Sequence, residues 1–245
     1  MIKVENLKIT LGEKNILDDV SFEVPAKTTL ALLGRNGCGK SVLLKSIAGL
    51  LSISEGKIFI GDKMVSDKNE YFDCSKLAYV FQKGGLFDFL DVENNTAFGL
   101  RRIGINEEEI SEKIAAVLQR VGLAGNETKL PSELSGGMQK RVGLARAICM
   151  NPEVILYDDP AAGLDPVLSD SISDLLLEIK DVQSATSIVV THDLKLARKI
   201  SDFVMLLYNG KSVFYGKTDE FFSGQNEFAR QFISGDSSGP MEAIV

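Results

Sequence analysis

The sequence lacks most of the features that mark secreted, membrane-spanning or metal-centred proteins. Its three cysteines, Cys38, Cys74 and Cys149, form neither a disulfide framework nor a metal-ligand spacing, which fits a reducing cytosol. No apolar run approaches the roughly 18 residues that cross a bilayer. The first residues, MIKVENLKIT, lack the cationic start and apolar block of a signal peptide. We therefore expect a cytosolic protein without membrane spans.

Positive charge is also scarce. The sequence has 27 Lys and Arg against 34 Asp and Glu, a formal net charge of −7. A protein that wraps nucleic acid needs clustered Lys and Arg to neutralise phosphates, so no nucleic-acid partner is expected. The length of 245 residues and the hydrophobic content of 44% fit one α/β domain, with room for an inserted subdomain.

Hydrophobic periodicity predicts strands that alternate with helices. Residues 2–34 contain three strands, of which TTLALLG is uniformly apolar, as a buried strand should be. Residues 40–50 are apolar at helical spacing. Further strands are expected at LAYVFQ, EVILYDD and TSIVVTH, and a hairpin in FVMLLYNGKSVFYG turns at its Asn-Gly pair. This alternation indicates a parallel sheet with covered faces.

The pattern becomes helical from about residue 86 to residue 150. Asn106 is expected to cap a helix whose first turn carries three glutamates. We interpret residues 1–216 as one domain with this helical subdomain inserted, followed by a helical or extended C-terminal extension over 217–245.

The stretch GRNGCGKS, Gly34–Ser41, fits the phosphate-loop pattern G-x-x-x-x-G-K-[ST]. It follows a buried strand and opens a helix, the context that the pattern requires; the alternative is a chance Gly-rich turn. Lys40 is expected to reach the β- and γ-phosphates, and the Ser41 hydroxyl to bind Mg²⁺. The predicted ATP contacts are Gly34, Arg35, Asn36, Gly37, Cys38, Gly39, Lys40, Ser41 and Val42.

Two carboxylates end the apolar strand VILYDD. Asp158 lies at the carboxyl end of the strand, where ligands gather in an open parallel sheet, and is expected to hold Mg²⁺ through water. The alternative is a solvated turn at the end of a strand. Beside a phosphate loop, the metal-associated role is the stronger interpretation.

The segment LSGGMQ, Leu134–Gln139, resembles the signature sequence of ABC-type ATPases. Gln82 resembles that family's Q-loop glutamine, AGLD at 162–165 resembles the D-loop, and His192 resembles the switch histidine. The alternative for His192, the only histidine, is a surface residue that caps a strand. The resemblance covers residues 2–216.

The resemblance implies a phosphate-loop NTPase fold with a RecA-like core, an N-terminal antiparallel β subdomain and the inserted helical subdomain. It implies catalytic roles for Asp159, His192 and Gln82, with Gln82 also sensing Mg²⁺. It further implies a head-to-tail homodimer that binds ATP between two chains. The contacts across the dimer would be Ser135, Gly136, Gly137 and Asp165 of the second copy.

Two positions depart from the family pattern. Leu11 stands where an aromatic residue usually stacks on the base, which predicts loose base selectivity unless a neighbouring side chain stacks instead. Asp159 stands where the family has Glu, so its carboxylate retracts by about 1.5 Å. Because a misplacement of about 1 Å can cost on the order of 100-fold in rate, we expect a slow ATPase. A clamp without turnover is the alternative.

A finer resemblance points to the ATPases of MCE-type lipid transporters, including the Mla phospholipid system. It rests on Phe81–Arg101, on Met138 and on FARQFISGDSSGP at 228–240. It implies permease subunits, an MCE-domain lipid-binding protein and a small regulatory subunit as partners, with this chain peripheral on the cytoplasmic face of the inner membrane. For the function, the alternative is the ATPase of a polar solute importer. For the segment 228–240, the alternative is a generic frayed chain end.

Two further expectations concern single side chains. Cys38 lies in the phosphate loop, where Lys40 and the helix N-terminus are expected to favour its thiolate. The segment 81–98 contains four phenylalanines, part of which should be exposed to receive a helix of a membrane partner.

Overall fold

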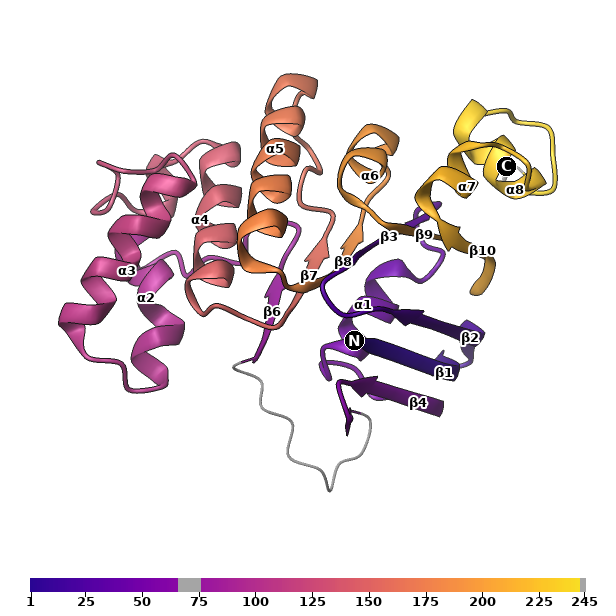
Figure 1. Ribbon diagram of the computed structural model, residues 1–245, viewed down its shortest axis with the longest axis horizontal. Helices are drawn as coiled ribbons and strands as arrows, with labels where there is room; N and C mark the ends of the chain where they lie inside the picture. Colours follow the sequence, from indigo (N-terminus) through magenta and orange to yellow (C-terminus); the bar gives the residue numbers. More distant parts are fainter. Residues whose placement is uncertain (66–75, 243–245) are drawn as a thin grey trace. The chain divides into compact units, whose positions relative to one another are not determined.

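The computed structural model describes residues 1–65 and 76–242, so Cys74 lies outside the described residues. The chain forms two compact units, residues 1–72 with 186–245, and residues 73–185 (Figure 1). The helices of the segment around 86–150 all belong to the second unit. No helix within the described ranges is long and apolar enough to cross a membrane.

The first unit contains an antiparallel sheet in the order β2-β1-β4-β5. Its strands are β1 (Ile2–Leu11), β2 (Lys14–Val24), β4 (Glu55–Ile60) and β5 (Lys63–Met64). Burial alternates along much of β1, so one face of this strand packs inward while the other meets solvent. β1 and β2 are two of the three strands that the sequence predicted within residues 2–34.

A second set of strands in this unit lies in the order β10-β9-β3-β8. These strands are β3 (Thr29–Gly34), β8 (Thr186–Val190), β9 (Phe203–Tyr208) and β10 (Lys211–Lys217). β3 runs parallel to β8 and to β9, and it is buried throughout. β9 and β10 form the predicted hairpin, in which Asn209 and Gly210 both have positive φ, as a tight two-residue turn requires.

The described residues of the first unit also form the helices α1 (Lys40–Ile47), α6 (Leu194–Ile200), α7 (Thr218–Phe222) and α8 (Glu227–Ser234). The C-terminal extension belongs to the core of this unit, because Phe221, Ala229 and Met241 are buried in one cluster with residues of β3 and β9. Gln231 holds Met241 at both ends, donating to its carbonyl and accepting from its N–H. The extension is therefore not a frayed end.

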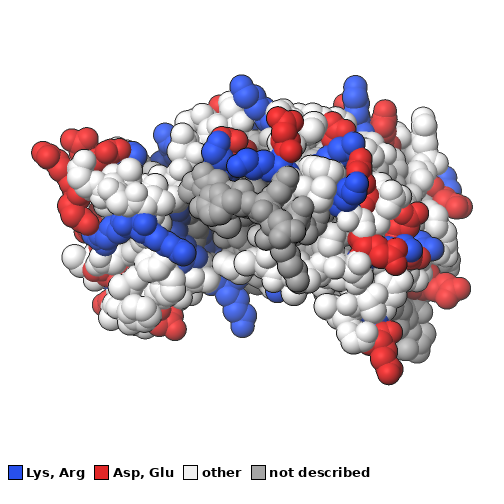
Figure 2. All heavy atoms as spheres, turned by 90° about the horizontal axis from the view of Figure 1, so that it is seen from below, with Lys and Arg blue, Asp and Glu red and all other residues white. Residues whose placement is uncertain are grey.

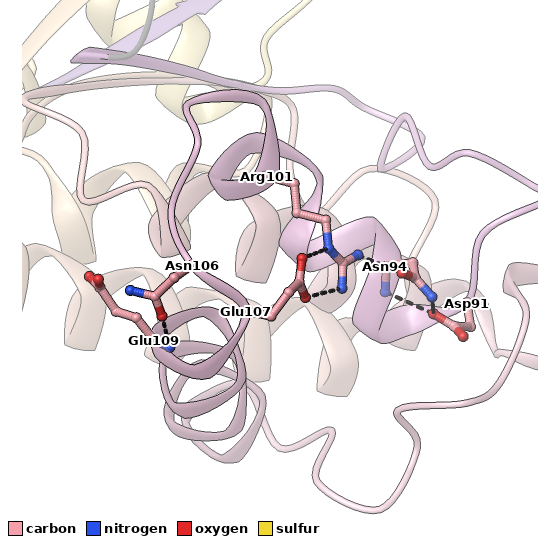
Figure 3. A network of polar contacts seen from close by, with 6 residues as sticks. All are labelled: Asp91, Asn94, Arg101, Asn106, Glu107 and Glu109. Carbon is pink, nitrogen blue, oxygen red and sulfur yellow. Dashed lines mark hydrogen bonds and ion pairs between the residues drawn. The ribbon is translucent and has the colours of Figure 1, made fainter.

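The second unit pairs β6 (Leu77–Val80) with β7 (Val154–Asp158) in parallel. Its helices are α2 (Val92–Arg102), α3 (Glu107–Arg120), α4 (Gly136–Cys149) and α5 (Pro166–Gln183), with a 3₁₀ turn at Pro131–Glu133. Asn106 caps α3 as predicted, since its side chain accepts a hydrogen bond from the Glu109 N–H (Figure 3).

Charge is mixed on the surface that Figure 2 displays, where basic and acidic side chains alternate without a broad basic area. Both signs of charge are expected on the surface of a chain with 27 Lys and Arg against 34 Asp and Glu.

Candidate functional site

The phosphate loop of the first unit follows β3 and opens α1, the context that its pattern requires. Three glycines of the loop have positive φ: 147° at Gly34, 78° at Gly37 and 109° at Gly39. A side chain at Gly34 would collide with the Leu207 carbonyl. Only glycine therefore allows the backbone to curl in this way beside β9.

Lys40 folds back over this loop. Its Nζ atom donates to the carbonyl oxygens of Gly34, at 2.7 Å, and Arg35, at 2.8 Å. The residue before the helix, Gly39, has no side chain with which to cap the first N–H groups of α1. The N–H groups at the start of a helix, beside an ammonium, suit a phosphate chain, and Ser41, exposed in the first turn, supplies a hydroxyl.

Arg35 joins the phosphate loop to the C-terminal extension. Its guanidinium donates to the carbonyls of Met241, at 3.2 Å, and Glu242, and lies 5.9 Å from the centre of the Tyr208 ring. A pocket of about 270 Å³ beside the loop is lined by residues 14–16, 35–38 and 208–210. Arg35, Asn36, Gly37 and Cys38 thus form one wall of an open pocket.

His192 lies at the same edge of the first unit as the phosphate loop. β3 and β8 are parallel neighbours, with Leu32 opposite Val190. Because parallel strands end at a common edge, the loop that starts at Gly34 and the loop that carries His192 are brought together there. His192 is exposed at this edge, and Asp193 after it caps α6.

The second unit brings Gln82 and Asp158 to one edge in the same way. Val80 of β6 lies opposite Tyr157 of β7, so the strands end side by side. Gln82 is exposed just beyond β6. Asp158 is only 8% exposed, and its Oδ2 atom accepts a hydrogen bond of 2.9 Å from the Tyr79 hydroxyl.

Asp159 turns the chain sharply after β7. Its φ is 51°, in the left-handed region that aspartate and asparagine enter more readily than most residues. Lys140 of α4 lies close by, and its ammonium donates to the carbonyls of Gln82 and Pro160, each at 3.1 Å. Burial lowers the pKa of Lys140, and the negative charge of Asp159 opposes that shift. Lys140 therefore ties the Q-loop backbone to the turn that holds Asp159.

The predicted signature residues begin α4. Ser135 is its N-cap, and its Oγ atom accepts a hydrogen bond from the Met138 N–H. Ser135 and Gly136 are exposed, whereas Gly137 is buried. A side chain added at Gly136 would meet no atom within 4 Å among the described residues, so the end of α4 is open to a ligand. Asp165 is exposed too, and its carboxylate caps α5 by accepting from two N–H groups.

Cys38 differs from the sequence expectation. Burial raises the pKa of its thiol, and the charge of Lys40 offsets that effect only partly. The predicted thiolate is therefore wrong, because desolvation of the half-buried sulfur outweighs the nearby ammonium. The other described cysteine, Cys149, is buried, and burial raises its pKa to about 11.

Leu11 ends β1 with 45% of its surface exposed. It can therefore offer an apolar contact to a base, although without aromatic stacking.

An apolar groove of about 440 Å³ opens on the second unit near the Q-loop. It is lined by Phe89, Leu90, Asn94, Phe98, Arg101 and Arg102. Phe89 is 78% exposed and Phe98 is 41% exposed, as the sequence predicted for part of this segment. Its rim is held in place because Arg101 bonds to both oxygens of Glu107 and to Asn94 (Figure 3).

Sequence reasoning missed Tyr79, Lys140 and Arg146. Arg146 donates to the carbonyls of Gly84 and Gly85, two and three residues after Gln82. The position of Lys140 directly after LSGGMQ was a signal visible in the sequence. No local pattern predicts which carbonyls the Lys140 and Arg146 side chains reach.

The groups expected to hold Mg²⁺ are the Ser41 hydroxyl, the Gln82 side chain and the Asp158 carboxylate. These are hard oxygen donors, which suit Mg²⁺. Within the described part of the chain, no three His, Cys, Asp or Glu side chains gather as a ready-made metal centre. The metal would therefore be held jointly with nucleotide phosphates, as is usual for Mg²⁺.

These motifs and this fold define a phosphate-loop ATPase, and the family comparison is specific. Residues 17–162 match the ABC transporter family. The chain belongs to this family, and it is the ATP-binding and ATP-hydrolysing part of an ABC transporter.

Three curated relatives show what the chain is similar to. Protein TRIGALACTOSYLDIACYLGLYCEROL 3 of Arabidopsis thaliana is 38% identical over 98% of this chain and 75% of its own length. The intermembrane phospholipid transport system ATP-binding protein MlaF of Haemophilus influenzae is 33% identical, over 98% and 93%. The methionine import ATP-binding protein MetN of Clostridioides difficile is 34% identical, over 97% and 75%.

A solved structure with the same fold is a dimeric ATP-binding cassette in a post-hydrolysis state, bound to ADP and Pi. It is 28% identical, with a TM-score of 0.79 over 89% of this chain and 99% of that chain. The fold class predicted from the sequence is therefore confirmed.

Proposed function

We propose that this chain powers the movement of phospholipid between membranes, as the ATPase subunit of an Mla/MCE-type transporter. The relative named for intermembrane phospholipid transport aligns with 98% of the chain, which includes the C-terminal extension beyond the family match. The methionine-import relative aligns with 97% of the chain, so the choice between the two roles rests on the extension itself.

The observation that carries this assignment is the bonding within the extension. Two parts of the segment that resembles the lipid transporters, R-Q-F at 230–232 and G-P at 239–240, come together. The Gln231 side chain forms two hydrogen bonds with the main chain of Met241, the residue after G-P. Met241 is 2% exposed, and Arg35 of the phosphate loop donates to its carbonyl. The extension is thus built into the nucleotide-binding unit.

ATP hydrolysis is assigned to the residues that the motifs single out. Lys40 and the N–H groups of the phosphate loop bind the triphosphate and stabilise the charge that develops on it. Asp159 orients a water toward the γ-phosphorus, with His192 and Gln82 assisting. The bond to the bridging oxygen then breaks, and ADP and phosphate leave. Mg²⁺, held by Ser41, Gln82 and Asp158, would neutralise phosphate charge.

The working form is a head-to-tail homodimer. Ser135, Gly136 and Gly137 of a second copy meet the γ-phosphate bound by the first, with Asp165 beside them. The exposed Ser135 and Gly136 support this role, since a closed helix end has no room for a phosphate.

The groove around Phe89 and Phe98 receives a helix of an integral-membrane permease. A helix that inserts an apolar side chain between these rings buries surface that is otherwise exposed. The chain would then sit peripherally on the cytoplasmic face of the inner membrane. Its further partners are an MCE-domain lipid-binding protein and a small regulatory subunit.

The main alternative is a polar solute importer, and the methionine-import relative favours it. Purification of the tagged chain from its native membranes, followed by mass spectrometry of subunits and lipids, separates the two. We expect a permease, an MCE-domain protein and bound phospholipid. An amino-acid-binding protein without phospholipid would contradict the lipid assignment. Phosphate release by the same complex excludes a clamp without turnover.

A further inference from the structure

Tyr79 contacts the carboxylate that is assigned to Mg²⁺. Its hydroxyl donates to Oδ2 of Asp158 at 2.9 Å, between the parallel strands β6 and β7. Hydrogen bonds to an ionised acceptor are roughly twice as strong as neutral ones. This bond therefore restrains the orientation of a carboxylate that is almost fully buried.

The donor is itself held in place. The centre of the Phe81 ring lies 4.5 Å from the centre of the Tyr79 ring, and this packing limits rotation of the phenol. Of the two groups, an ionised carboxylate can only accept, so the hydrogen of this bond comes from the Tyr79 hydroxyl. Tyr79 is thus a firmly held donor to Asp158.

Tyr157 provides a natural comparison. It precedes Asp158 on β7 and is also buried. Adjacent residues of a strand point to opposite faces of the sheet, so Tyr157 and Asp158 face opposite ways. If the fold only needs a buried hydroxyl in this sheet, loss of either the Tyr79 or the Tyr157 hydroxyl should have the same effect. If the hydroxyl acts through Asp158, only the loss at Tyr79 should matter.

We propose that Tyr79 is a positioning residue for Mg²⁺, whose hydroxyl fixes the Asp158 carboxylate in the orientation that holds the metal. This inference rests on the proposed role of Asp158. Without this bond the carboxylate is held less firmly in its orientation, and metal binding must then supply more of that order. Loss of a hydrogen-bonding partner behind a metal ligand typically lowers metal affinity by about 10- to 100-fold. Because Asp158 is expected to act through water, we predict a loss of about tenfold, at the lower end of that range.

The test compares Tyr79→Phe and Tyr157→Phe with the parent chain. Fluorescent ATP is first titrated into each full-length protein in excess EDTA, which gives the metal-free affinity. Mg²⁺ is then added in steps, and the concentration that produces half of its full effect on ATP affinity is measured. We expect metal-free ATP affinity to stay the same in all three. The half-saturating Mg²⁺ concentration should rise about tenfold in Tyr79→Phe only.

A double-mutant cycle with Asp158→Asn tests the route. If Tyr79 acts through Asp158, adding Tyr79→Phe to Asp158→Asn should shift the Mg²⁺ midpoint no further. An unchanged midpoint in Tyr79→Phe would overturn the proposal. Failure of Tyr79→Phe to fold would also overturn it, as would an equal loss of ATP affinity by Tyr79→Phe with and without metal. Failure of the parent to bind ATP would instead contradict the proposed function.

Discussion

The guanidinium of Arg146 lies over the ring of Phe87, 5.7 Å from its centre. The same guanidinium donates to the carbonyls of Gly84 and Gly85. The Phe87 ring in turn lies 4.6 Å from that of Phe98, in the exposed groove. Arg146 thus contacts both the Q-loop backbone and Phe87, whose ring packs against the groove residue Phe98.

Phe89→Asp should prevent docking while leaving nucleotide binding intact. Phe89 is 78% exposed, so the fold does not depend on it, but a charge in the groove would have to be desolvated by an incoming apolar helix. Co-purification of the permease measures the effect. Val182→Asp, at another exposed apolar position of the same unit, is the matched control. Retained co-purification by the Phe89 variant would mean that the partner binds elsewhere.

Lys140→Met should lower both turnover and stability. The substitution keeps the apolar stem but removes two bonds from an ammonium to carbonyls. Since Lys140 is partly exposed, we expect a stability loss of about 1–2 kcal/mol. We also expect turnover to fall on the order of tenfold or more, because the turn at Asp159 is less firmly placed. Urea denaturation and phosphate release measure the two effects. A parental rate in a stable Met variant would remove Lys140 from the account.

The described cysteines should alkylate slowly at neutral pH. Because burial raises both thiol pKa values, the thiolate fraction is lower than in a free cysteine. In a Cys74→Ser background, Cys149, with a pKa of about 11, should react more slowly than Cys38, whose sulfur lies near Lys40. Rates for each site come from mass spectrometry across pH.

The raised pKa of Cys149 also affects stability at high pH. The folded state holds the thiol proton more tightly than the unfolded state does, so this contribution is full below pH 9. It is lost as the pH rises from about 9 to about 11. In Cys149→Ala, the free energy of unfolding should fall less steeply between these two pH values. Rapid labelling of Cys149 in the parent chain at pH 7 would contradict this, because it would show that the thiol is not buried.

Lys40→Ala should weaken ATP binding by on the order of 30- to 100-fold, the equivalent of about 2–3 kcal/mol for a charged hydrogen-bonding group. The Lys40 ammonium bonds to carbonyls of its own loop, so its loss should leave the core packed. Lys45→Ala, in the last turn of the same helix, is the control. Isothermal titration with ATP and Mg²⁺ gives both affinities, and equal values would refute the phosphate-loop assignment.

Features set by local sequence were predictable. The phosphate loop, the Asn209-Gly210 turn and the Asn106 cap depend on residues a few positions apart, so their patterns survive in the sequence. Strand burial was readable for the same reason, since it follows the periodicity of apolar residues.

Features set by register and burial were not predictable. The bond between Tyr79 and Asp158 joins residues 79 positions apart, and it depends on which residues of β6 and β7 lie opposite each other. The thiol of Cys38 was misjudged because the sequence displays the nearby Lys40 but not the desolvation of the sulfur. The left-handed backbone of Asp159 was equally invisible, although it bears on how the shorter carboxylate is placed.

The central claim is that Asp159 orients the attacking water. Single-turnover hydrolysis of ATP by Asp159→Asn, measured in the assembled transporter, tests it most directly. Asparagine tolerates the left-handed φ of 51° as aspartate does, so only the charge changes. We predict that ATP binding persists, that the ATP-bound dimer accumulates, and that hydrolysis falls by about 100-fold or more. Hydrolysis by the Asn variant at the parental rate would contradict the claim.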